Sequence, residues 1–527
     1  MSKYTNKYER YTNLHQESRF ATPEEIRESG KMIDLREKCV RYGGIPLLCD
    51  TSRALVDDAD HHSIIFGATG SGKTRRLILI YMIILIKAAF SLIVIDVKGE
   101  LKKKTSGLAR QMGYNIVALN FRDFKNGDCW NPLEEAYRLY HSGKQEEAFS
   151  SVADFMSGLA AKQYEHCHDL FWPGMAEAQG KATLQSLLEC VPESMCNVAS
   201  FAEMCSESNY EIMMQFSRML SRTSPTAMSF RGIYSAAEKT RQSIEVTLYE
   251  MIKIFTDNRQ LQQMLSKSTF DMHAIGREKT IVYLEIADEK PTYYSLVGMF
   301  VKQAYEILIG EAQNQPDGKL EVPVALVLDE FCNIPKIENY SNIIATSRSR
   351  NICSTIVVQS NHQLERLYGY DADVIKGNCT NWFYLYSREL SLLNEISELC
   401  GNIKTVDGEV RRLISPSELQ RLKVGETLVL HDRLYPYITR MPDISEYKFP
   451  AYPEVASRPI EKTEIPVVDI RRLTACINEG LIPTPFASDV PAIDIAMKKE
   501  QRVGHREGDG RKAARDEMPQ RKQKRWI

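Results

Sequence analysis

The 527-residue sequence has no CxxC pair among its 12 cysteines and no apolar stretch at its N-terminus. Its first 20 residues, MSKYTNKYERYTNLHQESRF, are polar and charged, so they do not resemble a secretory signal peptide. Without the cysteine spacing of secreted domains, the cysteines are expected to be reduced and mostly buried as small apolar side chains. These absences together predict a cytoplasmic protein.

A strong excess of charge of one sign is also missing, because the formal net charge is −2 at pH 7. The overall charge therefore neither favours nor excludes a nucleic-acid partner. The distribution is uneven, since residues 498–527 hold 11 Lys/Arg and 5 Asp/Glu, or +6, which leaves −8 for the rest. We expect this tail to be disordered and to suit contact with nucleic acid or an acidic partner; a solvated tail without a specific partner is the alternative.

The sequence does contain a complete phosphate-binding loop. Residues 67–74 read GATGSGKT and satisfy the pattern G-x-x-x-x-G-K-[ST]. Glycines let backbone N–H groups turn toward phosphate, the Lys reaches the β and γ oxygens, and the Thr hydroxyl is a ligand of Mg²⁺. The predicted nucleotide site comprises Gly67, Ala68, Thr69, Gly70, Ser71, Gly72, Lys73 and Thr74, with Thr74 also a metal ligand.

A long apolar run follows the loop and has two interpretations. Residues 77–95 are almost all apolar, and a run of this length can span a bilayer. However, Lys87 lies near its middle, where a charge costs roughly 2.5–3.5 kcal/mol on insertion scales. We therefore predict a buried helix over residues 73–89 and then a strand, Ser91–Ile95, that ends at Asp96. A helix followed by an apolar strand is what a doubly wound parallel sheet requires.

A P-loop needs a carboxylate at the end of another core strand, and the segment VALVLDE at residues 324–330 provides one. We expect Asp329 to hold Mg²⁺, directly or through water, and Glu330 to polarise the attacking water. A strand that simply ends in solvated acids is the alternative, which the P-loop elsewhere in the chain disfavours. A further strand, Cys353–Val358, ends at Gln359, where a γ-phosphate sensor is expected.

Two arginines lie between these strands. A helix is predicted over Ser341–Ser349, with Arg348 in its last turn and Arg350 just beyond it. An Arg at a subunit boundary can reach the γ-phosphate bound by a neighbour and offset its developing charge. Alternatively, both are cations that interact with the C-terminal end of the helix macrodipole. The spacing alone does not decide between these roles.

Taken in order, these motifs resemble those of the type IV secretion coupling proteins, the TraG/TraD-like conjugative DNA-transfer ATPases. The P-loop alone is shared by many motors, whereas the ordered set is much more specific. The resemblance extends from about Ser18 to Pro442, and Val97 stands where the family usually has Pro. The segments that carry it, besides the P-loop, are SRFATPEEI (18–26), DVKGE (96–100), NPL (131–133), LDEF (328–331) and residues 349–360.

The resemblance implies a RecA-like motor that uses ATP and Mg²⁺, assembles as a homo-hexamer and pumps relaxase-bound single-stranded DNA into a type IV secretion channel. It implies catalytic roles for Lys73, Glu330 and Gln359, and it favours Arg348 as an arginine finger. Most members have N-terminal transmembrane helices, but residues 1–60 here contain no apolar run of even ten residues. We therefore expect recruitment to the inner face of the bacterial cell membrane by a separate membrane subunit, or a soluble form; docking of the basic tail on anionic lipid is a further alternative.

The predicted fold class is α/β: a RecA-like P-loop NTPase with a central, mostly parallel sheet and an inserted all-α domain. The all-α domain is predicted from 3.6-residue apolar periodicity with few strand signals. Its aromatic residues Phe155, Tyr164, Phe171 and Trp172 are expected in the core, with base stacking as the alternative. The expected division is a polar lead-in (1–54), the motor (55–149 and 271–445), the all-α domain (150–270) and an extended C-terminal segment with a disordered tail (446–527).

Two other functions remain open. A related P-loop motor would serve secretion assembly or DNA segregation. A non-enzymatic adaptor would bind nucleotide only to recruit protein substrates to the channel. The intact set of Lys73, Asp329 and Glu330 argues against the adaptor, because a site without catalysis would tolerate their loss.

Overall fold

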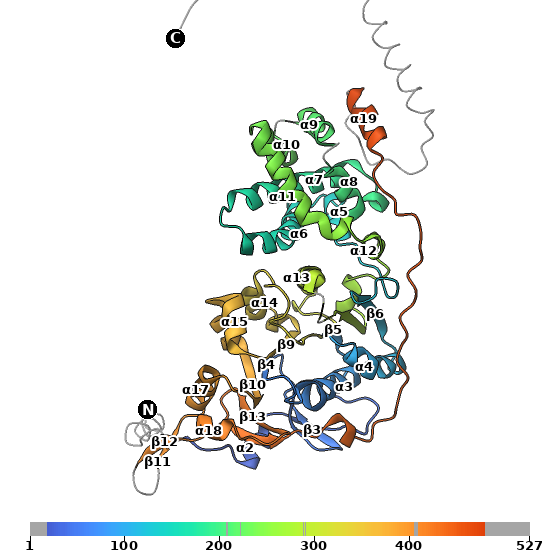
Figure 1. Cartoon of the computed structure of the whole chain (residues 1–527). Coiled ribbons are helices and arrows are strands. Elements are labelled where there is room, and N and C mark those ends of the chain that lie inside the picture. The colour runs from blue at the N-terminus through green and yellow to red at the C-terminus, as the bar shows by residue number, and fades with distance from the viewer. Residues whose placement is uncertain are drawn as a thin grey trace, which may run out of the picture.

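The computed structural model describes residues 18–206, 209–221, 223–287, 289, 291–404 and 409–479. Its centre is a large sheet that runs through the lower half of the molecule in the view of Figure 1. The strands of this sheet are β4 (His62–Gly67), β5 (Ser91–Asp96), β6 (Asn115–Asn120), β7 (Thr280–Glu285), β8 (Val324–Leu328), β9 (Ile352–Val358), β10 (Cys379–Tyr386), β13 (Glu426–His431) and β14 (Tyr437–Arg440).

The strand order is β14-β13-β10-β4-β9-β8-β5-β7-β6. Neighbouring strands from β10 to β6 are parallel, whereas β13 and β14 add an antiparallel edge. The predicted mostly parallel sheet is thus confirmed. Because the carboxyl ends of parallel strands share one edge, the residues that follow β4, β5, β8 and β9 meet there, far apart as they are in the chain.

Successive residues of each central strand point into two different cores. In β4, Ile64 and Phe66 belong to one apolar cluster and Ile65 to the other. Both faces of the sheet are therefore covered, which explains why its strands read as continuous apolar runs rather than alternating ones.

One face is covered by a π-helical turn at Thr74–Ile78, the helices α3 (Leu79–Lys87) and α4 (Glu100–Gln111), and a small antiparallel sheet. The opposite face is covered by α13 (Tyr294–Gln313), α14 (Tyr340–Thr346), α15 (Asn361–Tyr368) and α16 (Asp371–Asn378). The small sheet consists of β1 (Lys31–Asp34), β2 (Pro46–Cys49) and β3 (Arg53–Val56), and α2 (Pro23–Glu28) precedes it. Within the expected lead-in, the described residues 18–54 thus form short elements that pack against the motor.

The apolar run after the P-loop is buried in this core. The π-helical turn and α3 together cover Thr74–Lys87, and β5 covers Ser91–Asp96, as predicted. Every residue of α3 is buried, Lys87 included, because the helix is sandwiched between the large sheet and the small one. Among the described residues, none of the helices combines the length and the apolar character that crossing a membrane requires.

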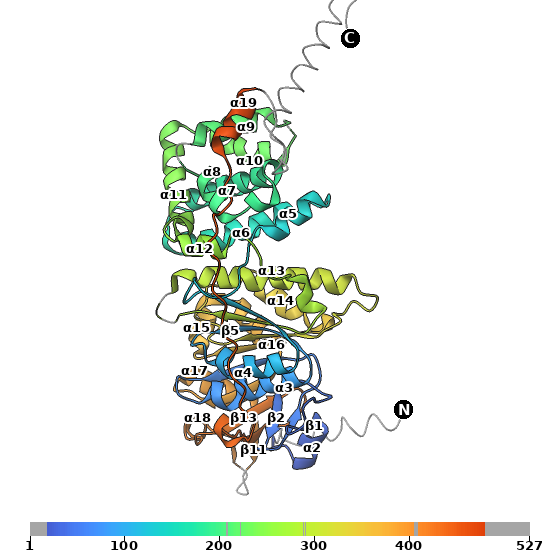
Figure 2. The same ribbon diagram turned by 90° about the vertical axis from the view of Figure 1, so that its right-hand side faces the viewer.

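The segment between β6 and β7 contains helices and no strand among its described residues, in agreement with the prediction of a helical insertion. Its helices are α5 (Glu134–His141), α6 (Gln145–His166), α7 (Phe171–Cys190), α8 (Val198–Met204), α9 (Tyr210–Met219), α10 (Pro225–Tyr234), α11 (Glu238–Thr256) and α12 (Arg259–Met264). They form a separate layer, and α13 lies between this layer and the sheet (Figure 2). The expected boundary at residue 150 falls inside α6, so the helical segment begins earlier, with α5.

Residues 448–469, which we call the strap, run from the motor to the helical segment (Figure 1). Val455 N–H donates to Ser106 Oγ of α4 (3.0 Å), and Val468 N–H donates to Ser200 Oγ of α8 (3.0 Å). A Cβ at Gly107 would lie 2.3 Å from Pro453 O, so only glycine lets the strap approach α4 this closely. The final described helix, α19 (Ile470–Asn478), packs against α9. The prolines after Pro436 thus mark an extended but attached segment; the predicted basic tail lies outside the described residues.

The remaining described elements flank the antiparallel edge of the sheet. They are α17 (Leu390–Leu399), β11 (Asn402–Lys404), β12 (Val410–Arg412) and α18 (Pro416–Leu419).

Candidate functional site

The P-loop leaves the carboxyl end of β4, a strand in the middle of the sheet. Gly70 and Gly72 have φ angles of +80° and +89°, which glycine adopts without steric cost. A Cβ at Gly67 would lie 2.5 Å from Ser71 Oγ and 2.9 Å from Lys73 Cγ. The loop therefore needs glycine at these positions, and it leads straight into the helical turn that begins at Thr74, where anions are favoured.

The Lys73 side chain folds over the loop. Its Nζ donates to Gly67 O (2.5 Å), and only 6% of the residue is exposed. Burial lowers the pKa of Lys73, while the charges of Glu330 and Asp329 act in the opposite direction. Ser71 Oγ is buried and has no hydrogen-bond partner among the described residues. A positive-φ loop with a buried ammonium and an unused hydroxyl has the donor set that fits a nucleotide phosphate.

Two carboxyl groups meet beside the loop. Asp96 ends β5 and Asp329 follows β8, and these strands are paired in parallel with Ile95 opposite Leu328. Burial raises the pKa of Asp329 to about 7, an effect that Glu330 strengthens and Lys73 weakens. Burial also raises the pKa of Asp96 to about 6. Asp96 Oδ2 accepts from Lys102 N–H (2.8 Å) at the start of α4, whereas Asp329 lies close enough to Lys73 for the ammonium to lower its pKa, so Asp329 is the carboxyl group that fits a Mg²⁺ ligand.

Gln359 connects the two halves of the site. It follows β9, and its Nε2 donates to Glu330 Oε2 while its Oε1 accepts from Thr69 Oγ1 (3.2 Å). Asn333 Nδ2 donates to the same Glu330 oxygen (3.2 Å). Glu330 itself has φ of +52°, an unfavourable backbone conformation for a residue with a side chain and one typical of functional sites. The structure thus brings together the P-loop, Asp329, Glu330 and Gln359; their individual roles stay predictions.

Arg348 lies at the opposite end of the sheet. The helix α14 ends at Thr346 rather than Ser349, and Arg348 begins a short 3-10 turn before β9, whereas Gln359 follows β9. The seven residues of β9 separate the two by about 20 Å. Arg348 is therefore excluded from the site of its own chain.

The structure also separates the two arginines by role. Arg350 Nη1 donates to Thr346 O (2.8 Å) at the end of α14, so Arg350 is the cation at the helix C-terminus. Arg348 is exposed and makes no hydrogen bond or ion pair with any described residue. This arrangement leaves the Arg348 guanidinium available to a neighbouring molecule.

A clamp on the helical turn after the P-loop was not apparent from any motif in the sequence. Arg75 makes a two-bond ion pair with Asp443 (2.9 and 2.6 Å), and Arg76 Nη1 donates to Met441 O (2.9 Å). These partners follow β14, so the antiparallel edge of the sheet holds the beginning of the P-loop helix.

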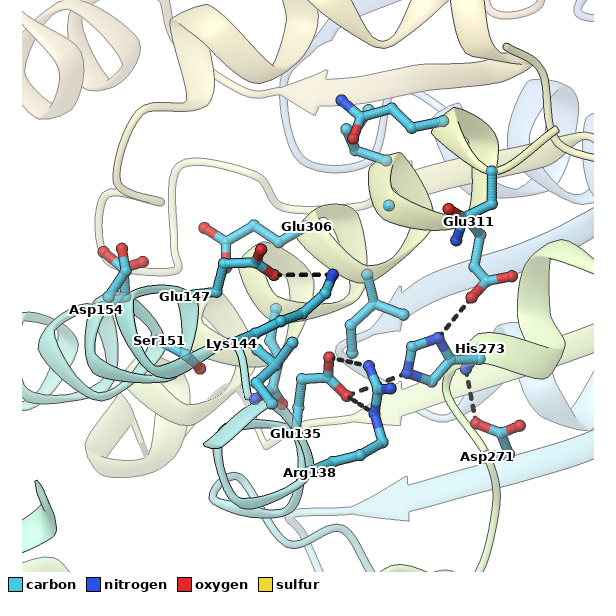
Figure 3. A pocket seen from close by; sticks show the side chains of 18 of the residues that line it. Glu135, Arg138, Lys144, Glu147, Ser151, Asp154, Asp271, His273, Glu306 and Glu311 are labelled. Carbon is cyan, nitrogen blue, oxygen red and sulfur yellow. Dashed lines mark hydrogen bonds and ion pairs between the residues drawn. The ribbon is translucent and has the colours of Figure 1, made fainter. Parts of the chain in front are cut away.

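A large cavity of about 860 Å³ lies elsewhere, where the helical segment meets α13 (Figure 3). His273 lies between two carboxylates in it, with Nε2 3.1 Å from Glu135 of α5 and Nδ1 2.8 Å from Glu311 of α13. Both ring nitrogens must carry hydrogen to serve both oxygens, and the bond to Glu135 raises the pKa of His273. The charged imidazole therefore ties the helical segment to the motor.

The aromatic residues of the helical segment divide into two groups. Phe155 is buried and stacks on Phe255, with ring centroids 6.2 Å apart. Tyr164 and Trp172 are partly buried against the core, whereas Phe171 is 48% exposed. The prediction of core packing therefore holds for Phe155, Tyr164 and Trp172, whereas Phe171 is the exposed one of these four residues.

The sheet order and the P-loop with its strand-end carboxylates define a P-loop nucleotide-binding protein of RecA-like fold. Within that class, the chain belongs to the family described as type IV secretory system conjugative DNA transfer, which matches residues 21–412.

Solved structures share this fold, and one curated relative matches part of the sequence. The plasmid coupling protein TrwB in complex with ADP and Mg²⁺ is 11% identical and superposes with a TM-score of 0.56, covering 85% of this chain and 96% of that one. TrwB with a non-hydrolysable ATP analogue gives 12% identity and a TM-score of 0.55 over 83% and 96% of the two chains. The uncharacterized protein pXO2-15 of Bacillus anthracis is 32% identical over 121 residues, 20% of this chain. The chain spans 42% of the length of that relative.

Proposed function

We propose that this chain is an ATP-hydrolysing coupling protein that pumps relaxase-bound single-stranded DNA into a type IV secretion channel. The observation that carries the proposal is the joining of the P-loop, Asp329, Glu330 and Gln359 at one edge of the sheet, in a chain of the conjugative DNA transfer family. TrwB, solved with an ATP analogue and with ADP and Mg²⁺, supports ATP and Mg²⁺ as the ligands here.

Each side chain has a distinct role in the proposed reaction. The loop amides and Lys73 bind the phosphates, and Thr74 Oγ1 and Asp329 hold the cation. When bound, Mg²⁺ neutralises negative charge on the phosphate oxygens. Glu330 orients the attacking water and accepts its proton, and Gln359 fixes the Glu330 carboxylate through the hydrogen bond between them.

The position of Arg348 supports an assembly in which sites are completed between subunits. Because it lies across the sheet from its own P-loop, it can act only on the nucleotide of a neighbour, as the finger of a homo-hexamer would. Mixing Arg348→Ala with Lys73→Ala subunits tests this. Activity should rise above that of either variant alone, since some boundaries then combine an intact P-loop with an intact finger. The absence of complementation at every mixing ratio would contradict action in trans.

The other expected partners follow from the same proposal. We infer a cytoplasmic protein recruited to the inner face of the bacterial cell membrane, in contact with the secretion channel or a separate membrane subunit. A grip on DNA that relies on backbone phosphates is sequence-tolerant and should weaken steeply with salt.

The deciding experiment is the ATPase rate with and without single-stranded DNA. DNA should raise the wild-type rate, and Lys73→Ala should lower the stimulated rate by on the order of 10²–10³-fold, because a donor to the phosphates is lost. Lys267→Ala, an exposed lysine outside the site, is the matched control and should behave as wild type. A wild-type rate that ignores DNA but responds to protein substrate would contradict DNA pumping and favour protein cargo.

A further inference from the structure

A cavity of about 700 Å³ opens beside α3, on the face of the sheet opposite α13 and separate from the P-loop. Its walls come from residues 36–38, α3, α4 and residues 444–454, which include the first residues of the strap. Figures 1 and 2 show α3 and α4 on the side of the motor away from the helical segment. Part of the lining is apolar or aromatic, and we call this part the floor; it includes Leu79, Ile83, Leu108, Tyr447 and Phe449.

Basic side chains form another part of the lining. Arg36, Lys38, Lys87, Lys103 and Lys104 line the cavity, against only two acids, Glu37 and Glu454. Arg36 is neutralised by an ion pair with Asp34. The four lysines of the lining have no carboxylate within ion-pair distance among the described residues. The cavity therefore combines the apolar floor with an excess of basic side chains.

Lys87 is the decisive residue, because its ammonium is buried and forms no ion pair with a described carboxylate, although the charges of Asp34 and Glu37 act on it from further away. Only 8% of it is exposed, and its Nζ donates to Leu35 O (2.6 Å) and Glu37 O (2.9 Å). It also lies 5.3 Å from the centroid of the Phe449 ring. No carboxylate of the described chain lies within 4.0 Å of Nζ. Carbonyl dipoles compensate a buried ammonium only in part, so an anion beside it is strongly favoured.

We propose that this cavity binds an acidic phospholipid, with its headgroup phosphate beside Lys87 and the start of an acyl chain on the apolar floor. A simple anion such as inorganic phosphate would leave the floor exposed to water, and a neutral apolar ligand would leave Lys87 uncompensated. Only an amphiphile with a negative headgroup satisfies both. The volume lies within the usual range of small-molecule sites. This site is independent of nucleotide binding and gives the motor a contact with lipid through its own folded core.

The first test is calorimetric titration of the full chain with short-chain lipids below their micelle concentration. Dihexanoyl phosphatidylglycerol should bind, whereas dihexanoyl phosphatidylcholine and glycerol 3-phosphate should bind at least tenfold more weakly. Lys87→Met keeps the length of the side chain and removes the charge, so it should abolish the preference for phosphatidylglycerol. Equal binding of the two lipids by wild type would overturn the proposal.

The second test uses exposed residues, so that folding is preserved. Lys103→Gln/Lys104→Gln should weaken binding to phosphatidylglycerol vesicles by on the order of thirtyfold, because each basic side chain near an anionic surface contributes about fivefold. The control is Lys239→Gln/Lys267→Gln, which neutralises two exposed lysines outside the cavity. The basic tail can also attract anionic vesicles, so the difference between the double variants is decisive. Equal weakening in both would overturn the proposal, as would binding of an acidic peptide, but of no lipid, that depends on Lys103 and Lys104.

Discussion

The raised pKa of Asp329 leads to a trade-off between stability and activity that can be measured. Burial raises this pKa from 3.8 to about 7, and one pKa unit corresponds to about 1.4 kcal/mol. The cost of ionising the carboxyl in the folded protein is therefore on the order of 4 kcal/mol. Asp329→Asn removes that cost, and its amide oxygen still accepts from Glu330 N–H, which now donates to Asp329 Oδ1 (3.0 Å).

The sign of the pH dependence follows from where the proton is held. Between pH 4 and 7 the folded protein keeps the Asp329 proton, whereas the unfolded chain has lost it. The contribution of Asp329 to the stability of the wild type therefore falls over this range, and the full cost of ionising its carboxyl is present above pH 7. The stabilising effect of Asp329→Asn should thus be small near pH 4 and largest at pH 8.

The measurement is the thermal unfolding midpoint of wild type and variant at pH 4.5 and pH 8, without nucleotide or Mg²⁺. We expect Asp329→Asn to raise the midpoint by roughly 4–8 °C at pH 8 and by much less at pH 4.5, while ATPase activity is lost. Asp58→Asn, at an exposed aspartate of the same domain, is the control and should change neither midpoint. The same increase at both pH values, or a decrease at pH 8, would refute the assignment of a buried, protonated Asp329.

Three further substitutions test other contacts. Gln359→Ala should lower kcat by on the order of 10²-fold in steady-state ATPase assays with little change in KM, because the hydrogen bond that orients Glu330 is lost. Arg75→Ala should raise KM for ATP several-fold but lower stability by less than about 1 kcal/mol, since the Arg75 side chain of the pair with Asp443 is 56% exposed to solvent. His273→Gln should speed limited proteolysis between the helical segment and the motor. The raised pKa of His273 means that its stabilisation is present at low pH and lost as pH rises through the folded pKa, so the effect of the variant should shrink at high pH.

Each of these has an outcome that contradicts it. A change confined to KM in Gln359→Ala would show that Gln359 only binds nucleotide. Unchanged ATPase kinetics in Arg75→Ala would show that the ion pair with Asp443 does not influence nucleotide binding at the P-loop. Proteolysis of His273→Gln that differs from wild type equally at all pH values would rule out a charged imidazole at the joint.

Much of the fold could be predicted because its signals are local. The P-loop pattern required glycines at fixed positions, and two of the three glycines in this loop have the positive φ angles that glycine favours. Strands β5, β7 and β8 could be located from apolar runs closed by polar residues, since a strand buried on both faces has that composition. Helix ends were less certain: α14 stops before Arg348, where the chain turns into β9, and the spacing alone did not reveal this.

Taken by itself, the sequence determined the P-loop, the carboxylates that follow β8, the α/β class and the helical insertion, because backbone conformation and burial leave local periodic patterns. Only the tertiary structure decided which strand ends lie together, and hence that Gln359 connects Thr69 to Glu330 while Arg348 is placed across the sheet. It also decided that Asp443 clamps Arg75 from 368 residues away and that the strap joins the motor to the helical segment. Such contacts depend on strand order and chain path, which no local pattern of residues encodes.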